Sequence, residues 1–246
     1  MLKLISIRRA VSIGVTLLLA IQSGTSQAAL SLSGTRVVFT SDKRNVSIIV
    51  RNPSLDIYAA QAWVNTEADD TTTAVPFIAS PPLFRLDPGK DQQVQINGLP
   101  NSLPTDRESL FYFNIQEIPH TNNITTNVLN IALRTRIKIF YRPHTLQGSS
   151  VARLQELQWS VLKVDGKTLL KVNNPTPFHV SFVRLEVLVN GKTVELKQPT
   201  MATPLGEQTF DLPDINPMPG MQVVFSAIND YGAYTKPMTR PIQTAR

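Results

Sequence analysis

The most regular hydrophobic pattern of the chain lies between Asn127 and Pro143, in the stretch NVLNIALRTRIKIFYRP. From Leu129 to Tyr141 every second residue is apolar or Thr, and the residues between them are mostly polar or basic. A period of two with many β-branched and aromatic residues predicts a β-strand. At about 3.3 Å per residue, the run from Asn127 to Arg142 would extend about 50 Å, about three times the length of a typical strand. We therefore expect one end of this strand to lie along the edge of a sheet.

An edge strand with regularly spaced, exposed Leu and Ile side chains favours aggregation unless another strand pairs with it. The pattern therefore indicates a segment that lends itself to a partner chain. Alternating strands also form the interior of ordinary sheets, so the period alone leaves both interpretations open.

The rest of the first half of the chain carries shorter alternating runs, separated by turn signals. Asn52-Pro53, Asp87-Pro88-Gly89 and Asn97-Gly98 are such signals. No window has helical periodicity over three turns. Many short strands with regular turns predict an immunoglobulin-like β-sandwich. The expected strands are LSLSGTRVVF, NVSIIVRN, YAAQAWVN, QVQINGL, SLFYFNIQEI and VLNIALRTRIKIFY.

A second set of strands follows residue 150, and Asp165-Gly166 and Asn190-Gly191 are strong signals for two-residue hairpins. Arg142–Ser150, a polar stretch with Pro and Gly, is the expected linker. The sequence thus predicts an all-β protein with two tandem domains, 29–147 and 148–246. The expected strands of the second are LQWSVLKV, LLKVNNP, VSFVRLEVLV, KTVELK, QTFDL, QVVFSAIND and a final short run.

Residues 1–28 have the three parts of a secretory signal peptide. Lys3, Arg8 and Arg9 form a basic start, 10–21 is mostly apolar, and Ser26-Gln27-Ala28 supplies small residues for cleavage. The apolar run is too short for a membrane anchor. We expect cleavage before Ala29, with the choice between Ala28 and Ala29 left open, and a mature protein without a membrane anchor.

The net charge and the absence of cysteine limit the possible classes of function further. The whole chain has a net charge of +6, and because three of its positive charges lie in the signal peptide, the remainder carries +3. So small a basic excess, without a basic patch that has interleaved aromatics, argues against nucleic acid as a partner. The chain has no cysteine, so an exported protein of this sequence must be stabilised by packing alone.

The motifs of enzymes are missing from the sequence. His120, His144 and His179 lie far apart and begin no metal-binding motif, and we interpret them as loop and surface residues. There is no G-x-S-x-G or P-loop pattern. We expect no catalytic residue, no metal and no cofactor.

Two motifs, NVLNIALRTRIKIFYRP and the upstream DRESLFYFNIQEIP (106–119), resemble those of the periplasmic pilus chaperones of the chaperone–usher pathway. The resemblance covers nearly all of the chain after residue 28. It implies two immunoglobulin-like domains set at an angle with a cleft between them. The loop between FNIQEIPH and NVLN is short and no cysteine flanks it, which resembles the short-loop branch of the family.

The resemblance also implies roles for individual residues. Arg36 and Lys138 match the cleft cations that bind the C-terminal carboxylate of a pilin subunit. A guanidinium and an ammonium suit a carboxylate because they form short, charge-assisted hydrogen bonds. Leu129, Ile131 and Leu133 match the residues of the donor strand, which completes the unfinished sandwich of the subunit. Strict alternation puts Lys138 on the opposite face from Leu133, and a bulge or twist could reconcile the two roles.

Further matches concern the architecture. Glu108, Arg142 and Asp230 correspond to an ionic network between the domains of the family. Ala79-Ser80-Pro81-Pro82 matches a turn region of the family, and X-Pro bonds such as those here accept the cis form far more readily than other peptide bonds.

The function implied is that of a periplasmic, ATP-independent chaperone. It would bind pilin subunits by donor-strand complementation and deliver them to an outer-membrane usher. The alternative from the residues is a structural pilin or adhesin with tandem sandwiches. Such a protein would carry an N-terminal extension of alternating apolar residues and a cysteine pair, and this sequence has neither.

Overall fold

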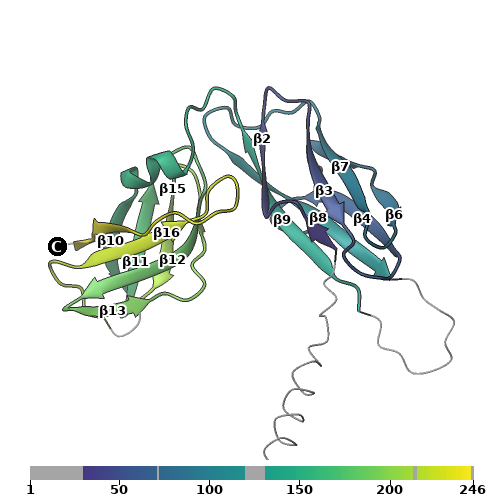
Figure 1. Cartoon of the computed structure of the whole chain (residues 1–246). Helices are drawn as coiled ribbons and strands as arrows, with labels where there is room; N and C mark the ends of the chain where they lie inside the picture. The colour runs from purple at the N-terminus through teal and green to yellow at the C-terminus, as the bar shows by residue number, and fades with distance from the viewer. Residues whose placement is uncertain (1–29, 71, 120–130, 213–214, 245–246) are drawn as a thin grey trace, which may run out of the picture.

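A computed structural model describes residues 30–70, 72–119, 131–212 and 215–244 of the chain. As the alternating pattern predicts, nearly all elements are β-strands, and they form two β-sandwiches in tandem, set at an angle to each other (Figure 1). The strands of the first sandwich are β1 (Ser31–Leu32), β2 (Arg36–Thr40), β3 (Asn45–Arg51), β4 (Tyr58–Asn65), β5 (Phe77–Ser80), β6 (Leu83–Leu86), β7 (Asp91–Gly98), β8 (Ser109–Pro119) and β9 (Arg134–Arg142).

The two sheets of the first sandwich have the strand orders β1-β3-β7-β5 and β2-β9-β8-β4-β6. Neighbouring strands run antiparallel except β2 and β9, whose parallel register pairs Arg36 with Lys138 and Thr40 with Arg142. On its other side β9 pairs with β8 from Arg134 to Tyr141. Because β2 begins only at Arg36, no described strand lies beside residues 134–137 on the β2 side of β9.

Two expectations about strand boundaries were wrong. The run LSLSGTRVVF is not one strand, because the chain crosses at residues 33–35 from the sheet of β3, which holds β1, to the sheet of β9, which holds β2. Of the strand expected from Asn127, residues 127–130 lie outside the described residues, and in the part that is described β9 begins only at Arg134, where its regular pairing with β8 begins. Before it, one further ladder bond joins Glu117 N–H to the carbonyl of Leu133 at 2.9 Å.

The core of the first sandwich follows from the alternation of its strands. In β9 the side chains of Ile137 and Ile139 are buried between the sheets. The rings of Phe39, Phe77 and Phe111 form an edge-to-face series, with both centroid distances at 5.1 Å. Aromatic pairs of this geometry add to the stability that their burial provides.

The second sandwich begins with a short 3₁₀ helix, η1, which the sequence pattern did not predict. Its two sheets have the orders β15-β11-β10-β18 and β13-β12-β16-β17, with β14 paired to β12. Its core surrounds Trp159, which is 2% exposed and packs on the rings of Phe182 and Phe225. Its elements are η1 (Val151–Glu156), β10 (Gln158–Val164), β11 (Lys167–Asn174), β12 (Val180–Val189), β13 (Lys192–Glu195), β14 (Met201–Ala202), β15 (Gly206–Asp211), β16 (Gln222–Ala227), β17 (Met238–Pro241) and β18 (Gln243–Thr244).

The same corner recurs in both sandwiches. Asn52 and Asn174 are completely buried and each precedes a Pro. In each case the side-chain oxygen accepts hydrogen bonds from the backbone and hydroxyl of the residue two positions on, Ser54 or Thr176. The amide group donates to two backbone carbonyls, one of the residue four positions on and one of a segment about 30 residues further along the chain. A buried Asn therefore satisfies the backbone groups that the turn leaves unpaired.

Two further observations complete the fold. The bond between Ser80 and Pro81 is cis, the form that the sequence allowed at this turn. Within the described part of the chain, no helix has the length and apolar character needed to cross a membrane.

Candidate functional site between the two sandwiches

The end of β9 is joined to the second sandwich by a buried ionic network. Arg142 donates from Nε to Glu108 Oε1 at 2.8 Å and from both terminal nitrogens to Asp230, at 2.8 and 2.9 Å. The side chains of Arg142 and Glu108 are 10% and 2% exposed, and that of Asp230 is 24% exposed. Burial alone would lower the pKa of Arg142, but its hydrogen bonds and the two carboxylate charges outweigh burial and raise it. The three residues that the sequence singled out therefore meet between the domains.

His179 completes this network, and our interpretation of it as a surface residue was wrong. It is 7% exposed, its backbone N–H donates to Glu108 Oε2 at 2.8 Å, and its ring Nδ1 lies 3.1 Å from the same oxygen. The segment PTPFHV reads as a loop in the sequence, and the burial of His179 depends on a carboxylate from the other sandwich. His144, which bonds to Ser41 Oγ at 3.0 Å, is a surface residue as expected, and His120 lies outside the described residues.

Arg36 and Lys138 lie side by side on adjacent strands, as their parallel register requires. Arg36 donates to the carbonyl of Ile228 in the second sandwich at 3.2 Å and lies 5.7 Å from the ring centroid of Phe140. No described carboxylate forms an ion pair with either cation, and the buried Nε of Arg36 has no hydrogen-bond partner among the described residues.

The electrostatics of this pair favour an anion. Burial lowers the pKa of Lys138, and the charge of Arg36 lowers it further, although Glu67 acts in the opposite direction. Burial also lowers the pKa of Arg36, against the attraction of Asp230. Two partly buried cations without a bound carboxylate repel each other and have lost hydration, so a carboxylate between them would relieve both costs.

The residues expected in the donor strand continue β9 beyond the paired part of the sheet. Ile131 and Leu133 are 62% and 48% exposed, and Leu129 lies outside the described residues. Leu133 has the same strand parity as Ile137, which faces the core, and Lys138 faces the other way. The register from 134 to 142 is regular, without a bulge. The apolar and the cationic residues therefore use opposite faces of one regular strand.

The cationic face of β9 also carries two stacked arginines that our sequence reasoning missed. Arg134 lies over the ring of Trp63 at 5.0 Å and Arg136 over that of Tyr112 at 3.8 Å. Asp69 binds Arg134, and the hydrogen bonds from Arg134 and Asn65 lower the pKa of Asp69 to about 2. Only the alternation of Arg134, Arg136 and Lys138 in the sequence pointed to this face.

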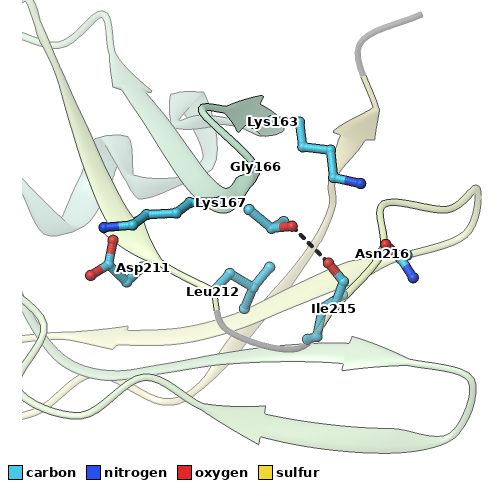
Figure 2. A pocket seen from close by; sticks show the side chains of 8 residues that line it. Lys163, Gly166, Lys167, Asp211, Leu212, Ile215 and Asn216 are labelled. Atoms are coloured by element: carbon cyan, nitrogen blue, oxygen red, sulfur yellow. Dashed lines mark hydrogen bonds between the residues drawn. The ribbon is translucent and has the colours of Figure 1, made fainter.

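A separate pocket of about 590 Å³ lies in the second sandwich (Figure 2). Lys163, Lys167 and Asp211 line it, and Thr168 Oγ1 donates to the carbonyl of Ile215 at 2.8 Å beside it. It shares no residue with the site between the sandwiches. In the described residues, no group of three His, Asp or Glu side chains is arranged to hold a metal ion.

Comparison with known proteins gives matches along both sandwiches. Residues 29–147 match the family model of the pili and flagellar-assembly chaperone PapD N-terminal domain, and residues 152–239 match that of the pili assembly chaperone PapD C-terminal domain. The probable fimbrial chaperone YadV of Escherichia coli (strain K12) is 34% identical over 221 residues, which cover 85% of this chain and 89% of the relative. The chaperone protein PapD of Escherichia coli is 36% identical over 210 residues, 84% of each chain.

Solved structures agree with these relatives. The crystal structure of the YadV chaperone superimposes with a TM-score of 0.75 at 32% identity, covering 87% of this chain and 100% of the other. The SafB chaperone in complex with the SafA pilin of Salmonella enterica gives a TM-score of 0.74 at 26% identity, covering 89% and 98%.

Proposed function

This chain belongs to the family of pilus-assembly chaperones, and we propose that it binds pilin subunits through the free edge of β9 and the cation pair Arg36 and Lys138. The observation that carries this proposal is that the free edge of β9 and the cation pair lie next to each other. The unpaired edge of β9 ends where β2 begins, and the two partly buried cations lie at that point.

The charge of the pair sets the direction of the guest strand. A strand added along residues 131–137 would point one of its ends at Arg36 and Lys138. A chain end that carries a carboxylate is stabilised there, whereas an N-terminal ammonium would be repelled. The guest strand therefore runs parallel to β9, with its C-terminus at the cations.

The opposite face of the strand supplies the second part of the interaction. Ile131 and Leu133 extend the apolar row of β9 beyond its own sandwich, and Leu129 continues the same alternation. Inserted into the open groove of an incomplete sandwich, these side chains would cover apolar surface while the backbone satisfies unpaired donors and acceptors. This is donor-strand complementation, and it needs no nucleotide.

Export and delivery belong to the same proposal. The chaperone acts in the periplasm, to which residues 1–28 direct it as a signal peptide that is removed before Ala29. It hands its subunits to an outer-membrane usher. Residues 29–147 and 148–246 act as its two domains, of which the first provides the donor strand and both contribute to the cleft.

The proposal is tested by co-expressing the chaperone with a pilin subunit from the same gene cluster. Arg36→Ala and Lys138→Ala should each reduce recovery of the complex, because a hydrogen bond to a charged group contributes about 1.5–3 kcal/mol. That loss corresponds to about a tenfold to hundredfold weaker complex. Arg44→Ala, which removes an exposed arginine of the same sandwich, is the matched control. Wild-type recovery by both cleft variants would place the carboxylate site elsewhere.

A further inference from the structure

The loop that follows β4, residues 66–70, carries three carboxylates and is called the acidic loop below. Arg136 Nη2 donates to the carbonyl of Glu67 at 3.3 Å and to that of the residue before it at 2.6 Å. Arg134 forms an ion pair with Asp69 of the same loop. Two arginines of β9 therefore fix the acidic loop close to their own strand.

The acidic loop begins in the same row of the sheet as the cation pair. The registers of β4, β8, β9 and β2 align one residue of each strand, which are Asn65, Tyr112, Lys138 and Arg36. Neighbouring strands lie about 4.8 Å apart, so the backbone of Asn65 is about 10 Å from that of Lys138. Glu67 follows two residues later, and its carbonyl is bound by a side chain of β9. Glu67 therefore lies close to the row that holds the two cations.

Glu67 differs from the other two carboxylates of the acidic loop. Asp69 pairs with an arginine of β9, and Asp70 accepts hydrogen bonds from the backbone N–H groups of the two threonines at 72 and 73. Glu67 is exposed, and among the ion pairs of the described residues there is none that involves it. Its negative charge is therefore available to act on the groups around it.

The two residues of the row next to the acidic loop both respond to this charge. Burial and the charge of Arg36 lower the pKa of Lys138, and Glu67 acts against them. Burial raises the pKa of Tyr112, and the charge of Glu67 raises it further. Both effects are those of a nearby negative charge, which favours the ammonium and disfavours the phenolate.

The charges around the proposed carboxylate site can be summed. Arg36 and Lys138 carry two positive charges and Glu67 carries one negative charge, so the three groups together have a net charge of +1. Asp230, which also attracts Arg36, is already bound by Arg142 through two hydrogen bonds. One guest carboxylate would bring the sum to zero, whereas a second acidic group at the end of the guest would make it negative. Juxtaposed like charges suppress the wrong partners of an interface.

We propose that Glu67 determines the charge selectivity of the cation pair, because it repels the guest carboxylate and disfavours any guest with a further acidic residue at its end. This inference rests on the proposed function, in which Arg36 and Lys138 bind the C-terminal carboxylate of a subunit. Glu67 therefore lowers the affinity for every guest and lowers it most for guests with acidic ends.

The test uses synthetic peptides that copy the last strand of a pilin subunit from the same gene cluster. One peptide ends in a free carboxylate and the other in an amide, and both are titrated by calorimetry into the exported chaperone and its Glu67→Gln variant. The carboxylate peptide should bind Glu67→Gln about twofold to tenfold more tightly than the wild type, as expected for a charge about 8 Å away in a partly hydrated site. The amide peptide should bind both proteins equally.

Three comparisons isolate the charge of Glu67 from other effects of the substitution. Glu67→Asp retains the charge and should keep most of the wild-type affinity. Glu195→Gln removes an exposed carboxylate of the second sandwich and should change nothing. At about 1 M salt, where the Debye length is about 3 Å, the gain in Glu67→Gln should largely disappear. A carboxylate peptide with Asp as its last residue should gain more from Glu67→Gln than the peptide with the native residue.

The outcomes distinguish this inference from the function on which it rests. If the wild type prefers the carboxylate peptide to the amide and Glu67→Gln binds the carboxylate peptide no more tightly, the role of Glu67 is overturned and the cation pair stands. An equal gain for the amide peptide, or for the native and the Asp-ended peptide, would also overturn it. If the wild type binds the carboxylate and the amide peptide equally, the cation pair itself is not the carboxylate site.

Discussion

At the scale of single residues, Lys138 differs from an ordinary surface lysine. Burial and then the charge of Arg36 lower its pKa, so it loses its proton at a lower pH than a solvated lysine does. The unfolded chain holds that proton more tightly between the two pKa values, so this group disfavours folding at low pH and the cost disappears as pH rises. A bound carboxylate would compensate for this cost by stabilising the protonated form.

A first prediction follows for the pH dependence of subunit binding. Affinity should be at its full value below the lowered pKa of Lys138 and should fall as pH rises through it, before the usual lysine value of 10.5 is reached. Calorimetric titration of a subunit at increasing pH measures the effect. Lys138→Met should bind weakly at every pH and should lose this dependence, and a wild-type profile that is flat up to 10.5 would contradict the role of Lys138.

A second prediction concerns Glu108. It accepts hydrogen bonds from Arg142 and from the backbone of His179 while only 2% of its side chain is exposed. Glu108→Ala leaves a buried guanidinium without this partner and should lower the free energy of unfolding by about 3–5 kcal/mol. Asp230→Ala should cost less, about 1.5–3 kcal/mol, because that carboxylate is partly in water.

Urea denaturation of the two variants and the wild type provides the comparison. Asp87→Ala is the matched control, since it removes an exposed partner of Arg85 and should change stability by less than about 1 kcal/mol. An equal effect of the Glu108 and Asp87 variants would mean that the network contributes nothing to the fold.

At the scale of elements, the alternating pattern of β9 continues from the core of the sandwich into a segment that is exposed to solvent. From Arg134 onward its apolar residues fill the core of its own sandwich, while Ile131 and Leu133 extend the same alternation into solvent. One alternating pattern in the sequence therefore encodes both a core strand and an exposed extension.

The third prediction compares the same substitution at two sites of this alternation. Ile131→Glu should leave the stability of the chaperone nearly unchanged, because the residue is 62% exposed, and should abolish subunit capture. Ile139→Glu, at a position with 0% exposure, should prevent folding because an unpaired buried charge is very costly. Denaturant midpoint and recovery of pilin from the periplasm are measured side by side. If Ile131→Glu strongly destabilises the chaperone and its folded fraction still binds pilin normally, Ile131 is a core residue and not a donor residue.

Most strands of both sandwiches could be predicted from the sequence. The alternation of apolar and polar residues is visible within one strand, and it corresponds directly to the buried and exposed faces of that strand in the fold. The hydrophobic pattern could not show that Arg36 and Lys138 are neighbours, since this requires parallel pairing of β2 and β9, which lie far apart in the sequence. Only the resemblance suggested it. The burial of His179 depends on Glu108 of the other sandwich, and no local pattern carries that information. The break between β1 and β2 was missed because their residues alternate as one strand.

At the scale of the whole molecule, the angle between the sandwiches rests on contacts from β9, from Glu108 and from the loop after β16. Arg142 binds Asp230 in a bidentate manner, and Arg36 adds a hydrogen bond to the carbonyl of Ile228. Paired bonds of this kind restrict rotation as well as separation.

The fourth prediction is that the angle loosens when the pair is removed. Asp230→Ala should broaden the distribution of interdomain distances in small-angle X-ray scattering, while each sandwich keeps its strands by circular dichroism. Asp211→Ala, which removes an exposed carboxylate of the second sandwich, should leave the scattering curve unchanged. Superimposable curves for Asp230→Ala and wild type would show that other contacts fix the angle.

If a guest strand binds as proposed, the parallel pairing of β2 with the end of β9 limits how far along β9 that strand can extend. In this binding mode the guest strand would be stopped where Arg36 begins β2, so its last residue would have only one position and its C-terminus would set the register. Subunits extended by two residues at the C-terminus should therefore be captured poorly, although a shift of two restores the same faces of the strand. Equal capture of extended and native subunits, measured by co-purification, would show that the chaperone reads the pattern of side chains and not the end of the chain.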